Sequence, residues 1–374
     1  TITVYDMSGS LTATNEVFSI SGMWNAPGWS IAAGDYNDDG YNDLLFGDSS
    51  SASFIKSDGD GYTFVSFPEY IFSQRTNFVD IDNDGNLDAF ACHDVDQSHS
   101  YKNDGSGNMV LDLNFFPTLD VGGNYASIWT DYNNDGLVDM YLSKCRGGAP
   151  EGDPQRINLL YKNNGDGTFT ESGEAANMND GDQSWSTAFA DFDNDGLREI
   201  FITNGYPRDV TDHDFAAYAS GIGGSLLRTI DLLDSIPEVK ISNYIFKNNG
   251  DLTFEDKTKE WGLDIPSYSN GAAYADLDND GDLDLVVNNI NDKAFVYENQ
   301  LYSEGGKEKP ANNYLRIKLN GSKNDFPAQG TKIVVHFGEG QKQFYEQSVY
   351  RGYLSSVENI AHFGLGDYET VDSI

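Results

Sequence analysis

Five short segments gather oxygen-bearing side chains at one fixed spacing that suits a divalent cation. Each has the pattern Asp-x-Asp/Asn-x-Asp-Gly-x-x-Asp/Glu, and the five span residues 35–43, 80–88, 131–139, 191–199 and 276–284. Ca²⁺ takes roughly six to eight oxygen ligands at irregular angles. Positions 1, 3, 5 and 9 supply side-chain oxygens, position 7 can add its backbone carbonyl, and Gly at position 6 permits a sharp bend. The pattern predicts one Ca²⁺ site per loop, about five ions in all.

The candidate metal ligands are the residues at positions 1, 3, 5, 7 and 9 of loops 1 to 5. They are Asp35, Asn37, Asp39, Tyr41 and Asp43; Asp80, Asp82, Asp84, Asn86 and Asp88; Asp131, Asn133, Asp135, Leu137 and Asp139; Asp191, Asp193, Asp195, Leu197 and Glu199; and Asp276, Asp278, Asp280, Asp282 and Asp284. Without cations, the carboxylates crowded into one loop would repel one another strongly.

Two other interpretations of the loops compete with this one. An EF-hand opens with the same pattern but needs a bidentate Glu at position 12. Position 12 here is always apolar: Phe46, Ala91, Leu142, Ile202 and Val287. The side chain that completes the Ca²⁺ site must therefore be the one at position 9. The second alternative is that the loops are only Asx-rich hairpin turns, which their fivefold recurrence disfavours.

The residues around the loops predict a repeated β-sheet unit. Short apolar runs flank each loop, and a second turn such as 163–169 or 248–254 follows between an aromatic strand and another strand. Each unit then contains four antiparallel strands over about 45–60 residues, which is typical of a β-propeller blade. Residues 4–11 match only the second half of a unit, and the unit that begins at residue 276 has three strands. The number of blades stays open.

Three further segments do not follow the pattern of the repeated unit. Residues 206–240 lengthen the fourth unit, and Leu226, Leu227, Ile230 and Leu233 fall at helical spacing. We expect a short helix on the rim, or alternatively a cap for a ligand or partner. Residues 303–311 have the composition of a linker. Beyond them, residues 314–319 and 332–337 predict strands of a small all-β domain, which takes residues 312–374.

The first 302 residues resemble the FG-GAP or VCBS-type repeats of integrin α-subunit propellers. The resemblance rests on the five Asp-x-Asp/Asn-x-Asp-Gly-x-x-Asp/Glu loops and implies Ca²⁺ binding within a seven-bladed ring, although five full repeats and one half are visible. Segments 313–319, 330–335, 351–356 and 362–366 look like an ASPIC/UnbV domain truncated at its end. That domain follows such repeats in cartilage acidic protein-like proteins and in bacterial surface or lipoprotein relatives.

No catalytic constellation stands out in the sequence. It lacks the G-x-S-x-G, H-E-x-x-H, P-loop and C-x-x-C patterns. Asp212, His213 and Asp214 form the single local acid–base cluster. Trp129, Trp185 and Trp261 are expected to fill the core between units, with stacking on sugars as the alternative. We therefore expect no enzyme, but a calcium-stabilised binding or adhesion module for protein or glycan. The alternative is a calcium-dependent polysaccharide hydrolase or lyase on a propeller scaffold.

Charge and cysteine usage limit the partners and the location. The net charge is −37, nearly all of it before residue 303. This disfavours nucleic acid and anionic lipid, and no apolar run approaches the ~20 residues of a membrane span. Protein, glycan or other subunits of a surface assembly remain as partners.

Cys92 and Cys145 are predicted to be free buried thiols, with a disulfide between neighbouring blades as the alternative.

Weak Ca²⁺ sites fill where Ca²⁺ is abundant, so we expect an extracellular or cell-surface location, with the periplasm as an alternative. The first residues have neither a basic leader nor an apolar stretch. We therefore expect a trimmed piece of a longer protein whose targeting signal is not in this chain.

Overall fold

The computed structural model describes residues 2–6, 14–18, 28–116, 122–145, 152–178, 184–205, 238, 240–302, 312–320, 328–350, 352 and 355–374. These residues form strands and no helix, which confirms the all-β prediction. Among them, no helix has the length and hydropathy needed to cross a membrane. The predicted helix within 206–240 and the linker 303–311 lie outside the described residues, apart from Glu238 and Lys240.

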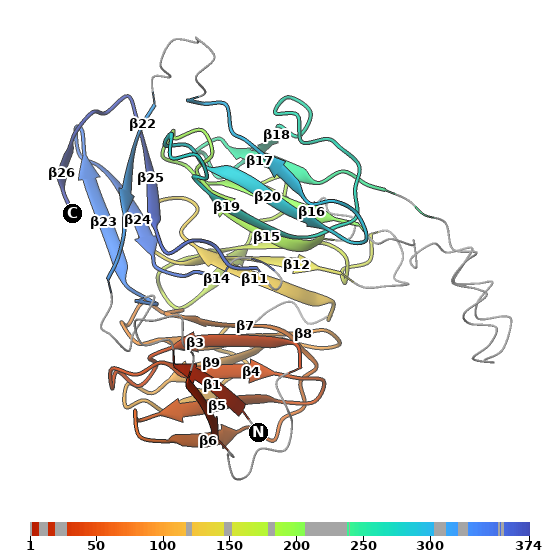
Figure 1. Cartoon of the computed structure of the whole chain (residues 1–374), viewed down its shortest axis with the longest axis vertical. Helices are drawn as coiled ribbons and strands as arrows, with labels where there is room; N and C mark the ends of the chain where they lie inside the picture. Colours follow the sequence, from red (N-terminus) through yellow and green to blue (C-terminus); the bar gives the residue numbers. More distant parts are fainter. Residues whose placement is uncertain are drawn as a thin grey trace, which may run out of the picture.

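Five antiparallel sheets correspond to the five repeats, and we call them blades 1 to 5 (Figure 1). Blade 1 contains β3 (Ser30–Gly34), β4 (Asp43–Gly47), β5 (Ala52–Ser57) and β6 (Tyr62–Ser66). Blade 2 contains β7 (Ser73–Val79), β8 (Asp88–His93), β9 (His99–Asn103) and β10 (Met109–Leu111). Blade 3 contains β11 (Asn124–Thr130), β12 (Asp139–Lys144), β13 (Leu159–Asn163) and β14 (Phe169–Glu171).

The last two blades differ in their number of strands. Blade 4 contains β15 (Ser184–Ala190), β16 (Glu199–Asn204), β17 (Tyr244–Asn248) and β18 (Phe254–Asp256). Blade 5 has three described strands, β19 (Ser269–Ala275), β20 (Asp284–Asn289) and β21 (Phe295–Tyr297). The N-terminal half unit is a separate hairpin of β1 (Ile2–Asp6) and β2 (Thr14–Phe18). The described residues thus contain five blades, and not the seven that the family resemblance implies.

Neighbouring blades pack face to face through their first strands. Contacts join β3 to β7, β7 to β11, β11 to β15 and β15 to β19, and an apolar cluster fills each of the four spaces between consecutive blades. Every residue of β8, β12 and β16 is buried, because these strands have a neighbouring blade on both faces. This burial explains their continuous apolar runs. Position 12 of each loop is buried and lies in the second strand of its blade.

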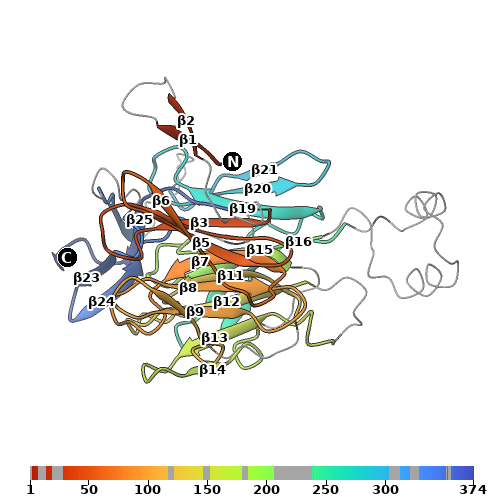
Figure 2. The same cartoon turned by 90° about the horizontal axis from the view of Figure 1, so that it is seen from below.

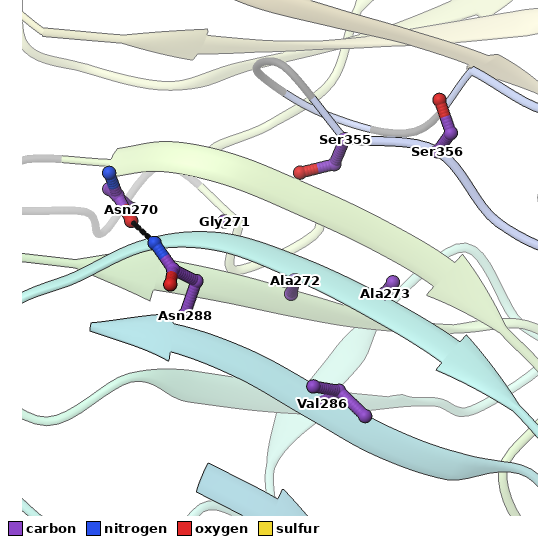
Figure 3. Close-up of a pocket in the computed structure, with 8 residues that line it drawn as sticks. All are labelled: Asn270, Gly271, Ala272, Ala273, Val286, Asn288, Ser355 and Ser356. Carbon is purple, nitrogen blue, oxygen red and sulfur yellow. Dashed lines mark hydrogen bonds between the residues drawn. The ribbon is translucent and has the colours of Figure 1, made fainter. Parts of the chain in front are cut away.

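The face of blade 5 that does not pack against blade 4 is less buried than the faces between blades. Figure 3 shows Gly271 and Ala273 of β19 beside Val286 and Asn288 of β20, with Ser355 and Ser356 from the C-terminal part of the chain at the border of this surface. Asn288 is exposed, and its side-chain amide donates to the side-chain Oδ1 of Asn270 at 2.7 Å. Blade 5 is therefore the less enclosed end of the described series.

The C-terminal strands form two further small sheets. One pairs β22 (Asn313–Ile317) with β25 (Ala361–Gly366), and the other orders β24 (Gln341–Glu346), β23 (Lys332–Phe337) and β26 (Val371–Ser373). Their side chains share a separate apolar cluster around Val335 and Phe363. Both views show this C-terminal region (blue) along one side of the blades (Figures 1 and 2).

The two cysteines are free and buried, so the disulfide alternative is wrong for this structure. Cys92 lies within β8, whereas Cys145 directly follows β12. Burial raises the pKa of the Cys92 thiol to about 12, which makes it an unreactive core residue.

Candidate metal centres

The acidic loops connect the first and second strands of the blades and share one backbone turn. In loop 2, the Asp80 carboxylate accepts hydrogen bonds from the N–H groups of Asp84 (3.0 Å) and Gly85 (2.9 Å). Loops 1, 3 and 4 repeat this pair of bonds. The glycine at position 6 has a positive φ in all five loops, 93° at Gly85, which a residue with a Cβ rarely adopts. This turn directs the loop oxygens inward.

Position 4 was not singled out by the sequence analysis, yet it shapes the turn and links neighbouring loops. It has a positive φ in every loop, and the residues are Asp38, Asn83, Asn134, Asn194 and Asn279. Asn and Asp tolerate this left-handed conformation better than other side chains. The amide of Asn134 donates to the Gly196 carbonyl (3.0 Å), and that of Asn194 donates to the Gly281 carbonyl (3.1 Å). The recurrent Asn or Asp at position 4 was the available signal.

Position 9 is the first residue of the second strand, and its carboxylate ties the loop to the sheet. Asp88 accepts the N–H of Ile81 at 3.0 Å and that of Asn103 at 2.8 Å. The carboxylates of Asp43, Asp139 and Asp284 accept the equivalent two N–H groups. Position 9 therefore has a clear structural role, besides any role as a metal ligand.

A second residue type that sequence reasoning missed is the Asn at the end of the third strand. The amide of Asn103 donates to the Tyr36 carbonyl (2.7 Å) in the loop of blade 1 and to the Leu87 carbonyl (3.0 Å) in its own loop. Asn163, Asn248 and Asn299 bridge their own loop and the preceding one in the same way. The acidic loops are thus joined from blade to blade. The repeated aromatic-Lys-Asn sequence was the visible signal.

Three loops bring their carboxylates close enough to share one cation. The groups are Asp80, Asp82 and Asp88 in loop 2; Asp191, Asp193 and Glu199 in loop 4; and Asp276, Asp278 and Asp280 in loop 5, with one ligand atom from each residue within 4.8 Å of the others. Positions 1, 3 and 9 therefore meet in loops 2 and 4, and positions 1, 3 and 5 meet in loop 5. Loops 1 and 3 form no such carboxylate group among the described residues, and their position 3 is Asn37 or Asn133 instead of Asp.

Each of these three groups contains a buried carboxylate oxygen with no hydrogen-bond partner. They are Asp82 Oδ1 in loop 2, Glu199 Oε1 in loop 4 and Asp276 Oδ1 in loop 5. A buried anionic oxygen that lacks a partner is costly, and a cation removes that cost. The donor set contains oxygen and no sulfur or imidazole, which suits Ca²⁺ rather than zinc or copper. The residues present therefore fit a hard divalent cation.

Burial raises the pKa values of several loop carboxyls. Desolvation is the largest cause at Asp88, whose pKa rises to about 7 with a further contribution from the charge of Asp82. The pKa of Asp191 rises to about 8 through burial and the nearby charges of Asp195 and Asp193. Burial also raises the pKa of Glu199 well above its usual range. These groups favour a bound proton or a bound cation over an uncompensated charge.

Basic side chains from the third strands already approach the loops. Lys102 pairs with Asp82, and Lys162 pairs with Asp135 at 3.0 Å. Lys247 contacts both Asp193 and Asp195 in loop 4. These lysines offset part of the negative charge, and a metal ion would have to displace their ammonium groups from the ligand oxygens.

The C-terminal region lies directly on the acidic loops. Lys332 of β23 pairs with Asp80 at 2.6 Å, and Arg316 of β22 pairs with Asp276 at 2.6 Å. The Gly364 N–H donates to Asp191 at 3.1 Å. The first carboxylate of three loops is therefore in contact with the C-terminal region, a relation that the sequence analysis did not predict.

The same region also reaches the first strands of the blades. The Tyr350 hydroxyl accepts the N–H of Ala33 in β3 at 2.6 Å and donates to its carbonyl at 2.9 Å. Ser355 lies 3.3 Å from the Ser186 hydroxyl in β15. Gly352 packs so closely on Thr187 that an added Cβ would lie 2.7 Å from its backbone nitrogen. This segment fixes the C-terminal region against blades 1 and 4.

No convergent acid–base set occurs in the described part of the chain outside the loops. His99 and Tyr101 are hydrogen-bonded at 3.2 Å, but both are buried and the pKa of His99 falls to about 4 because of burial. Trp129 fills the core between blades 2 and 3, and Trp261 packs on the core between blades 4 and 5. The Trp185 indole donates to the Gly205 carbonyl. Asp212, His213 and Asp214 lie outside the described residues.

Comparison with known proteins gives several relatives. The chain is 26% identical over 236 residues to mouse (Mus musculus) cartilage acidic protein 1, which covers 63% of this chain and 31% of the relative. The human (Homo sapiens) protein of the same name is 26% identical, with 64% and 30% covered, and that of Xenopus tropicalis is 26% identical, with 57% and 36% covered. The chain thus spans about a third of the length of these relatives.

A solved structure of the Chaetomium thermophilum Nup170 NTD–Nup53 complex is similar over 69% of this chain and 34% of that chain, with 9% identity. Its TM-score of 0.27 is too low to support an argument.

Family models cover both parts of the chain. One described as FG-GAP-like repeat matches residues 35–91, 131–202 and 239–287, which include all five acidic loops. A second, described as ASPIC and UnbV, matches residues 321–374 and includes strands β23 to β26. The chain is therefore an FG-GAP-like repeat protein with a C-terminal ASPIC and UnbV domain.

Proposed function

We propose that this chain is a calcium-stabilised recognition module that works outside the cell and binds protein or glycan without catalysing a reaction. The observation that carries the proposal is the set of buried carboxylate oxygens without partners, one in each of three acidic loops. Five loops with positive φ at positions 4 and 6, joined to one another by four bridging Asn residues, favour one ion per loop. The proposed ligands are the residues at positions 1, 3, 5, 7 and 9.

Calcium has a structural task in this proposal. Each loop joins two strands of its own blade, and loops 2 to 5 are bonded to the preceding loop through an Asn such as Asn103. A cation that neutralises the loop would therefore hold both the hairpin and the contact between blades. The relatives named cartilage acidic protein support an extracellular role of the adhesion type. Weak sites of about 10⁻⁴–10⁻³ M would be filled there.

The opposite end of the blades is the proposed ligand surface. The C-terminal region covers the acidic loops, as the contacts of Lys332 and Arg316 illustrate. In an antiparallel blade, the connection between the second and third strands leaves from the other end of the sheet. The 206–240 insertion is such a connection, between β16 and β17. A protein or glycan ligand would bind near this end.

The test measures stability and binding together. Ions that bind only the folded state stabilise it by mass action, so removal of Ca²⁺ with a chelator should lower the Tm by many degrees and reveal about five ions per chain in metal analysis. If chelation left the Tm unchanged, the loops would be turns only and not metal sites. Glycan and protein arrays should then show binding without turnover. Release of products from a polysaccharide would support the hydrolase or lyase alternative instead.

A further inference from the structure

The residue that closes the second strand of a blade can cap the turn that follows it. This residue is position 14 of each repeat, counted from the first Asp of the acidic loop: Asp48, His93, Lys144, Asn204 and Asn289. In blade 1, Asp48 Oδ1 accepts the N–H of Ser50 at 2.6 Å. In blade 2, His93 Nδ1 accepts the N–H of Val95 at 3.2 Å instead. Asp and Asn are ordinary turn residues, whereas an imidazole can change its charge near neutral pH.

The contacts of the His93 ring require the neutral imidazole. A backbone N–H can only donate, so Nδ1 must keep its lone pair for Val95. The ring also has a hydrogen bond with the Tyr70 backbone and an edge-to-face contact with the Tyr70 ring, with centroids 5.5 Å apart. A proton on Nδ1 would place two N–H donors against each other and end the bond to Val95. An Asn side chain has an acceptor oxygen and no such protonated state.

His93 lies beside a second buried histidine, His99. The two residues are 2% and 5% exposed, and their ring centroids are 5.9 Å apart. The other titratable groups around the pair in the described residues are Glu69, Tyr70, Asp94, Asp96 and Tyr101. Burial lowers the pKa of His93, and burial together with the charge of His93 lowers that of His99 to about 4. The carboxylates of Glu69 and Asp96 act in the opposite direction, but both residues are exposed and burial dominates.

The turn that His93 caps, residues 94–98, joins blade 2 to blade 3. It lies at the end of blade 2 opposite the acidic loop, where the proposed ligand surface lies. The Asp94 carbonyl accepts the N–H of Gly123 at 2.5 Å. The side-chain amide of Asn124 in β11 donates to Ser98 Oγ at 3.1 Å. A rearrangement of this turn would therefore disturb the contact between the two blades.

We propose that His93, together with His99, makes this turn an acid-sensitive switch: protonation releases the 94–98 turn and loosens the contact between blades 2 and 3. An unfolded His has a pKa of about 6.5, and the folded value is depressed at both residues. The stabilising contribution is therefore complete above about pH 6.5 and is lost as the pH falls toward about 4. This inference goes beyond the proposed function and depends neither on a ligand nor on Ca²⁺.

The acidic loops respond to pH in the opposite direction, because burial raises the pKa of carboxyls such as Asp88. A local measurement on the full chain in saturating Ca²⁺ separates the two effects. Hydrogen exchange of the 94–98 turn at pH 8 and pH 5, corrected for the intrinsic exchange rates, reports how often the turn opens. In the wild-type protein, opening should increase at least about tenfold at pH 5. The histidine-free turn 290–294 of blade 5 should not show this increase.

The variant His93→Asn copies the residue that blades 4 and 5 carry at this position, Asn204 and Asn289. It keeps an acceptor for Val95, so the turn should remain closed at pH 8, and the increase at pH 5 should be less than half that of the wild type. The double variant with His99→Asn should lose the increase altogether. His336→Asn is the matched control, because His336 is exposed on β23 in the C-terminal region, and it should keep the wild-type response.

An equal increase in the wild type and the double variant, or no increase in the wild type, would overturn the proposal. A second measurement needs no variant at these positions. Titration of the histidine ring signals of the wild-type protein by NMR should give midpoints below about 6.5 for His93 and His99. A midpoint at or above this value for His93 would also overturn the proposal, because the folded protein would then accept the proton without opening the turn.

Discussion

Loops 4 and 5 have nearly the same nine-residue pattern, but different basic side chains lie around them. In loop 4, Lys247 from the blade's own third strand contacts Asp193 and Asp195. In loop 5, Glu298 replaces that lysine, and Arg316 from the C-terminal region pairs with Asp276. The motif defines the turn and the oxygen donors in both loops. Residues outside the motif decide which positive charge competes with a metal ion.

The two loops also differ in how their position-9 carboxylate is satisfied. Asp284 accepts N–H groups on both oxygens, from Leu277 (2.9 Å) and Asn299 (2.8 Å). Glu199 accepts the Phe192 N–H at 2.8 Å on one oxygen, and its other oxygen is buried without a partner. At position 9, loop 5 is therefore closed by hydrogen bonds to both carboxylate oxygens, whereas loop 4 retains a buried carboxylate oxygen without a partner. We expect loop 4 to depend more strongly on a cation.

The largest expected effect is on pH dependence. The pKa values of Asp88 and Asp191 rise to about 7 and about 8 in the folded state, above the value of about 4 expected for an unfolded Asp. The folded state then binds more protons, so its stability is greatest at low pH and is lost as pH rises through the folded pKa values. Metal-free protein should therefore lose several degrees of Tm between pH 5 and pH 8.

Saturating Ca²⁺ should remove most of this loss, because the ion replaces the proton as the compensating charge. Thermal melts at both pH values, with chelator and with Ca²⁺, measure the effect. A metal-free Tm that rises between pH 5 and pH 8 would contradict the assignment of buried, uncompensated carboxylates.

Position 9 should separate the two loops directly. Glu199→Gln removes the buried charge of loop 4 and keeps an acceptor for Phe192, so it should raise the metal-free Tm by a few degrees. Asp284→Asn in loop 5 loses one of two accepted N–H bonds and should lower it, at a cost of about 1–3 kcal/mol. Glu199→Gln should also reduce the number of bound ions by one, because Glu199 belongs to the carboxylate group of loop 4. Tm shifts of the same sign in the two variants would contradict the proposed difference between loops 4 and 5 at position 9.

The repeated unit was predictable from the sequence, because apolar runs and acidic turns alternate locally within it. The contacts of the C-terminal region with the acidic loops and the blades were not predictable from the sequence. Lys332, Arg316 and Tyr350 look like ordinary polar residues in the sequence, and their partners lie more than two hundred residues away in two of the three cases. The bridging Asn residues form an intermediate case, since the pattern was visible but the partner carbonyl lies in the preceding blade.

Removal of the competing cation should raise Ca²⁺ affinity at one loop at a time. Lys247→Gln should strengthen the site in loop 4 and Arg316→Gln the site in loop 5, each by about tenfold, since one positive charge near the ligands is lost. Calorimetric titration of the two variants measures this. Arg316→Gln should also loosen the C-terminal region, because Arg316 pairs with Glu358 at 2.8 Å as well. Unchanged affinity in both variants would show that these side chains leave the loops freely.

The smallest expected effect concerns the Asn bridges between blades. Asn248 is 2% exposed and joins loop 4 to the Tyr132 carbonyl in loop 3, whereas the less buried Asn299 joins loop 5 to the Phe192 carbonyl in loop 4. Asn248→Ala leaves buried carbonyl groups without a donor and should cost about 1–2 kcal/mol of unfolding free energy. Asn299→Ala should cost less, because water can reach the freed carbonyl groups at blade 5. Denaturant melts in saturating Ca²⁺ compare the two variants. A larger cost at Asn299 would mean that blade 5 is held as firmly as the enclosed blades.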